Sequence, residues 1–128
     1  MEQPQQQRPF AADADIDRTP LAADEAEKEL DASSDYVHLR AGLNRLTIET
    51  ALKPQPSGFK DAQGRDRNSF RFLTDQVNLA GQKKIWSTTS YSLARQVIDQ
   101  LRKGQHALML LKNVDASSGK SEIVYVQQ

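Results

Sequence analysis

Residues 68–90, NSFRFLTDQVNLAGQKKIWSTTS, decide the fold that the sequence predicts. Two runs that contain aromatic and β-branched residues flank a Leu-Ala-Gly turn at residues 79–81, which indicates a hairpin of two strands. Neighbouring side chains in a strand point to opposite faces. If Ile85 faces a core, Lys84 and Trp86 share the opposite face, which is exposed to water.

The same alternation applies to the first strand of this hairpin. Phe70 and Phe72 share one parity and are expected in the core, whereas Arg71 has the other parity. Cations and an aromatic ring on one exposed sheet face suit a single-stranded nucleic acid, because charge attracts phosphates and a ring stacks on bases. The hairpin therefore predicts binding through Arg71, Lys84 and Trp86.

The composition limits the alternatives. A chain of 128 residues is long enough for one modest core, and the absence of cysteine excludes disulfides, thiolate metal sites and cysteine nucleophiles. The polar N-terminus lacks the apolar region of a secretory signal, and no apolar run approaches the ~20 residues of a membrane span. We expect a soluble protein of the cytoplasm, associated with the nucleoid or, for a viral source, in the host cytoplasm.

The net charge of zero hides a segregation of the two signs. Residues 1–35 hold ten acids and three bases (net −7), and residues 36–128 hold fourteen bases and seven acids (net +7). Residues 1–35 are also poor in large apolar residues, which predicts a disordered acidic arm, with a transient helix between residues 21 and 30. A basic domain suggests an anionic partner. The acidic arm is expected either to compete with this partner for the basic surface or to recruit replication or recombination proteins.

The rest of the chain predicts the order of the remaining elements. Residues 36–52 alternate as a strand, and residues 53–67, rich in Pro, Gly and charge, indicate a long loop. After the hairpin, a helix capped by Ser90 is expected over residues 91–103, ended by Gly104, and strands follow at residues 106–114 and 121–128. This β-β-β-α-β-β order predicts an all-β domain with one helix at residues 36–128, a five-stranded Greek-key barrel of the oligonucleotide-binding (OB) type.

The segments LRAGLNRLTIET, NSFRFLT, KKIWSTTSYSLARQVIDQL, HALMLLKNV and IVYV resemble OB-fold single-stranded DNA-binding proteins of phage, plasmid and prokaryotic type. The resemblance covers residues 36–128 and rests on element order and residue character. It implies a groove across the second and third strands, closed by the loops after the first and fourth. It implies roles for Arg71, Lys84 and Trp86 on the sheet, for Lys60, Arg65 and Arg67 in the first loop, and for Lys112 or Lys120 in the last hairpin. The acidic arm departs from the pattern, because bacterial relatives usually carry their acidic tail at the C-terminus.

Several interpretations stay open at this stage. Trp86 is expected to stack on a base, with a plug in the barrel as the alternative, and Phe59 is either a loop anchor or a stacking residue. Lys83 joins Lys84 and the loop cations in a predicted phosphate track. No nucleophile with a base, metal-ligand pattern or phosphate loop is present, so we expect neither an enzyme nor a cofactor.

The sequence thus predicts sequence-tolerant single-stranded DNA binding in replication, recombination or repair. The alternatives are an OB-fold module that binds proteins and an RNA-binding protein. A homo-oligomer is left open.

Overall fold

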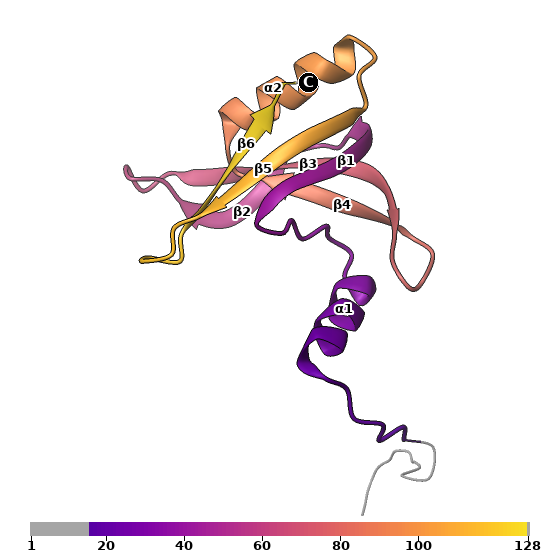
Figure 1. The fold of residues 1–128 in the computed structure, drawn as a ribbon. Helices are drawn as coiled ribbons and strands as arrows, with labels where there is room; N and C mark the ends of the chain where they lie inside the picture. Colours follow the sequence, from indigo (N-terminus) through magenta and orange to yellow (C-terminus); the bar gives the residue numbers. More distant parts are fainter. Residues whose placement is uncertain (1–15, 128) are drawn as a thin grey trace, which may run out of the picture.

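The structure, a computed structural model, describes residues 16–127 (Figure 1). This part of the chain is mostly β, as predicted, but it holds six strands and two helices instead of five strands and one helix. In chain order the elements are α1 (Ala23–Ser33), β1 (Gly42–Ala51), β2 (Gln55–Lys60), β3 (Asp66–Val77), β4 (Lys83–Thr88), α2 (Tyr91–Arg102), β5 (Ala107–Val114) and β6 (Ser121–Val126).

Strand β3 is central to one antiparallel sheet. Its partners β1 and β2 follow one another along it, with Ala51 opposite Phe72 and Gln55 opposite Ser69, so they act as one long, bent strand. Strand β4 pairs with β3 as well, β5 pairs with β1, and β6 pairs with β5. Within residues 16–127 no pairing joins β4 to β6, and the sheet is not a closed barrel.

The core lies between one face of this sheet and α2. Alternating residues of the strands point into it, and α2 adds three side chains, as its helical spacing requires. The buried apolar residues are Leu46, Ile48, Phe72, Trp86, Leu93, Ala94, Val97, Leu108 and Leu110. Phe70 and the β6 residues Ile123 and Tyr125 pack against this cluster. The expected core positions of Phe70 and Phe72 are therefore confirmed.

Local signals predicted α2 and the β3–β4 turn correctly. The Ser90 side chain accepts a hydrogen bond from the Leu93 amide at 3.2 Å, which caps α2, and Gly104 takes a positive φ of 78° just after the helix. In the turn, the Asn78 side chain accepts hydrogen bonds from the amides of Ala80 and Gln82. These side-chain bonds and the positive φ of Gly81 fix the hairpin that the sequence predicts.

The prediction of a long loop at residues 53–67 is wrong. Residues 55–60 form β2, residues 66 and 67 open β3, and only residues 61–65 turn, around the carboxylate of Asp61, which accepts hydrogen bonds from the amides of Gln63 and Arg65. Pro56 and Gly58 suggested a loop, but β2 is an edge strand, where a proline costs no hydrogen bond of the sheet.

The predicted exposure of Trp86 and Lys84 is also wrong. Both side chains are buried, with 2% and 7% of their surface exposed, and Ile85 lies on the opposite face, half-buried. The pairing of β3 with β4 explains this result, because Trp86 lies directly opposite Phe72, and paired residues share a face. The amine of Lys84 escapes the core by donating a hydrogen bond to the backbone carbonyl of Asp31 at the end of α1.

The segment before β1 is attached to the sheet at β4. Ile85 donates its amide hydrogen to the carbonyl of Asp35 and accepts one from Val37, both at 2.8 Å, so residues 35–37 run beside the edge of β4. Helix α1 matches the helix indicated near residues 21–30, buries no side chain, and projects away from the sheet on the side opposite α2 (Figure 1). The first part of the predicted disordered arm, residues 1–15, lies outside the described residues.

Candidate nucleic-acid interface

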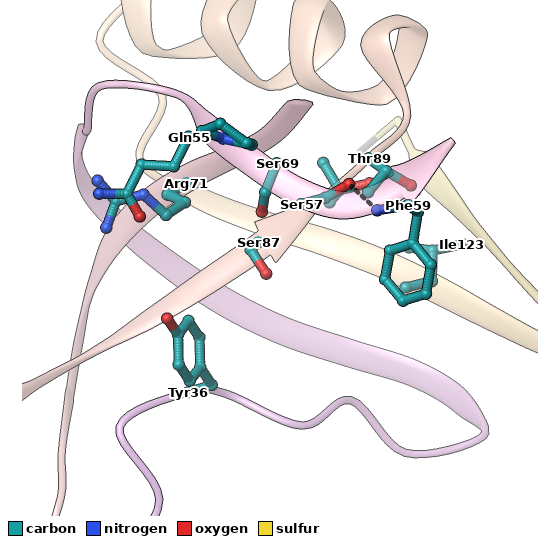
Figure 2. A pocket seen from close by; sticks show the side chains of 11 residues that line it. Tyr36, Gln55, Ser57, Phe59, Ser69, Arg71, Ser87, Thr89 and Ile123 are labelled. Atoms are coloured by element: carbon teal, nitrogen blue, oxygen red, sulfur yellow. Dashed lines mark hydrogen bonds between the residues drawn. The ribbon is translucent and has the colours of Figure 1, made fainter. Parts of the chain in front are cut away.

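A groove of about 500 Å³ lies on the side of β3 and β4 that faces away from the core (Figure 2). Ser69 and Arg71 of β3 and Ser87 of β4 line it, and these residues alternate with the core residues of the same strands. Strand β2 forms one wall, and Ile123 of β6 contributes where β4 and β6 do not pair with each other. The open sheet therefore exposes a polar trough beside apolar side chains.

Arg71 is the cation inside this groove. Its guanidinium donates two hydrogen bonds to the backbone carbonyl of Lys53, from Nη2 at 2.9 Å and from Nε at 3.3 Å. The side chain is half-buried, and the remaining N–H groups of its planar fork stay available. Arg71 is thus held in place before any ligand arrives and can still bind a phosphate with two hydrogen bonds.

Two exposed aromatic rings border the groove on different sides (Figure 2). Tyr36 is 44% exposed and belongs to the segment that runs beside β4, whereas Phe59 is 66% exposed and lies on β2. The backbone amide of Phe59 donates to the hydroxyl of Ser57, which in turn donates to the carbonyl of Arg67. Hydrogen bonds therefore fix the backbone at both residues, and the exposed rings can stack on a nucleobase.

Hydroxyl groups cover the floor of the groove between these rings. They belong to Ser57, Ser69, Ser87, Thr88 and Thr89. Hydroxyls both donate and accept hydrogen bonds, and they carry no charge that would repel a phosphate. The floor therefore suits a polyanion that passes over it in more than one register.

The β2–β3 hairpin carries three further cations. Lys60 forms an ion pair with Asp66 at 2.7 Å and Arg65 forms one with Asp61 at 3.2 Å; Asp61 is half-buried, and the other three side chains are exposed. Arg67 donates to the carbonyl of Thr89 at 3.0 Å, at the rim of the groove. An exposed pair such as Lys60–Asp66 contributes only ~0–1 kcal/mol, so a phosphate can replace Asp66 at little cost.

Three of the predicted site residues are thus brought together, in the groove or at its rim: Phe59, Arg67 and Arg71. Lys60 and Arg65 lie farther along the β2–β3 hairpin, and the other four predicted residues do not line the groove either. Trp86 and Lys84 are buried, Lys83 pairs with Glu49 at 2.5 Å, and the Lys112 amine donates to the Leu39 carbonyl at 3.1 Å. Lys112 shares the parity of Leu108 and Leu110, which turns its stem towards the inner face of β5.

Sequence reasoning missed Tyr36 and Ser87. Tyr36 was placed at the start of the first strand, but β1 begins at Gly42, and only the pairing with Ile85 brings Tyr36 to the groove. The sequence predicts Thr88, Thr89 and Ser90 as capping residues of α2 and assigns no role to Ser87. Ser87 lies on the outer face because it pairs with Arg71, and the sequence pattern alone does not give this register.

Comparisons with protein families, curated proteins and solved structures found no match to this chain. Among the described residues, no helix is long and apolar enough to cross a membrane. The same residues contain no group of three or more His, Asp or Glu side chains placed to hold a metal ion.

Proposed function

We propose that the chain binds single-stranded DNA without sequence preference, in replication, recombination or repair, and that the strand passes through the groove between Tyr36 and Phe59. The observation that carries this proposal is that one groove combines the fixed guanidinium of Arg71 with two exposed aromatic rings. Single-stranded nucleic acids are bound by this pairing of a positive track with stacking surfaces.

The topology supports the same proposal. If β1 and β2 are counted as one bent strand, the order of strands and the position of α2 are those of an OB fold that is not closed between β4 and β6. In that fold the second and third strands and the loops beside them contact oligonucleotides. Here the corresponding strands are β3 and β4, and the corresponding loops are the β2–β3 turn and the β5–β6 turn.

The binding energy would come from two sources. Each base that stacks on an aromatic ring contributes ~1–3 kcal/mol. If Arg71 and three hairpin cations neutralise about four phosphates, the logarithm of the affinity falls with a slope of about −2.8 against the logarithm of the salt concentration, so that affinity drops about 50-fold between 50 and 200 mM salt.

The experiment is a titration of fluorescently labelled oligo(dT) with the full-length protein, followed by anisotropy. We expect Tyr36→Ala and Phe59→Ala each to weaken binding by about 5-fold or more, from the stacking energy above. Tyr91→Ala is the matched control, because Tyr91 is 63% exposed on α2 and does not line the groove. Absence of binding at low salt, or an equal loss with Tyr91→Ala, would overturn the proposal.

The same titration separates the alternatives. An RNA oligonucleotide that binds at least tenfold more tightly than oligo(dT) would make the protein an RNA-binding protein. If the protein binds no single-stranded or double-stranded nucleic acid, the protein-interaction module is the remaining alternative.

A further inference from the structure

The outer face of β1, β5 and β6 carries apolar side chains that lie outside the core cluster. The strand register aligns them in two rows, because Leu111 lies opposite both Leu43 and Val124, and Met109 lies opposite Val126. Leu43 and Val124 are 65% and 40% exposed. We call these five residues the outer patch. Met109, Leu111 and Val126 are half-buried. Contiguous apolar surface that remains open to water marks interaction sites.

Two charged residues occupy opposite corners of the outer patch. Arg45 lies on β1 opposite Met109, and Glu122 lies on β6 opposite Asn113, at the other end of the patch. Both are exposed, and within residues 16–127 neither forms an ion pair. Two strand spacings and four residues separate them, which is about 17 Å along the diagonal.

This arrangement is self-complementary. Consider a two-fold axis that lies in the plane of contact, perpendicular to the line from Arg45 to Glu122. This axis places Arg45 of one copy over Glu122 of the other and brings the apolar rows of the two copies face to face. Each copy then contributes the same surface, as a closed dimer requires. The strands of the two sheets cross at a large angle, close to the orthogonal mode of sheet packing. This self-complementary placement of opposite charges favours a second copy of the chain over an unrelated partner.

We propose that two copies of the chain associate through the outer patch, with Arg45 of each copy facing Glu122 of the other. The apolar rows supply the contact area, and the two charge pairs at its rim set the orientation. None of the outer-patch residues lines the groove, so a dimer presents two open grooves. The dimer does not depend on what the groove binds.

The experiment measures the mass of the full-length protein by sedimentation velocity and by light scattering. We expect twice the 14.3 kDa mass of one chain at high micromolar concentration, and a monomer for Leu43→Asp. Val77→Asp is the control, because Val77 is 56% exposed on β3 and outside the outer patch, and it should leave the dimer intact. Circular dichroism confirms that each variant is folded.

Charge reversal tests the orientation. Arg45→Glu and Glu122→Arg each place like charges together at both contacts, and each should raise the dissociation constant of the dimer about tenfold. An equimolar mixture of the two variants places opposite charges at both contacts, so it should dimerise as the wild type does. A monomeric wild type, a dimer that survives Leu43→Asp, or a mixture that stays as weak as the single variants would overturn the proposal.

Discussion

Replacing Trp86 by alanine tests whether the sheet is folded as described. The side chain is 2% exposed, and its ring stacks on that of Phe72, which is 1% exposed, with centroids 5.5 Å apart and planes 28° apart. Removing a buried tryptophan costs ~3–5 kcal/mol, because the lost contacts leave a cavity. A protein of this size has a total stability of roughly 5–15 kcal/mol, so the variant is expected to be partly unfolded or close to it.

The assay is urea unfolding followed by far-ultraviolet circular dichroism, which does not depend on the tryptophan. A loss of ~4 kcal/mol lowers the midpoint by about 2 M if the free energy of unfolding changes by ~2 kcal/mol per molar urea. Trp86→Phe keeps a ring against Phe72, and it should cost less than half as much and leave the affinity for oligo(dT) unchanged. A stable, folded Trp86→Ala variant that has lost oligo(dT) binding would refute this assignment and place the ring on the DNA.

Two further perturbations address local contacts. Lys84→Met removes the buried amine that donates to the Asp31 carbonyl at the end of α1. The amide of Leu79, which donates to the carbonyl of Ala32, should then exchange its hydrogen faster, while the global free energy of unfolding changes by less than ~2 kcal/mol. Unchanged exchange at Leu79 would show that this amine does not anchor α1. In the β5–β6 turn, the backbone amide of Ser117 and then its hydroxyl donate hydrogen bonds to the carboxylate of Asp115 and lower its pKa. The contribution of Asp115 to stability is therefore fully present above the pKa of an unfolded aspartate, and it is lost as the pH falls through the lower pKa of the folded state. A titration by carbon-detected nuclear magnetic resonance should give this carboxyl a pKa below that of an unfolded peptide, and an equal or higher pKa would contradict the turn geometry.

Local signals in the sequence were enough for the parts of the fold that short-range chemistry determines. Helix α2 begins after Ser90 and ends before Gly104, as predicted, and the turn around Gly81 is fixed by hydrogen bonds to the side chain of Asn78. The parity of Phe70, Phe72 and Arg71 within β3 was correct as well.

The errors arose where long-range pairing overrides a local rule. Lysine usually faces water, which made Lys84 a poor choice for the core, but the register with β3 and the carbonyl of Asp31 decide its place. Pro56 suggested a loop, although an edge strand accepts it. Tyr36 reaches the groove only through the backbone of Ile85, which no local pattern reveals.

The proposed function requires that a single strand of DNA lies in the groove beside Arg71. The most direct measurement follows the backbone amide resonances of the labelled protein as unlabelled oligo(dT) is added. We expect the largest shifts on residues 57–59, 67–71 and 87–89 and on Tyr36, with α2 and the outer patch unaffected. Shifts centred on α2 or the outer patch, or none at saturating oligo(dT), would contradict it.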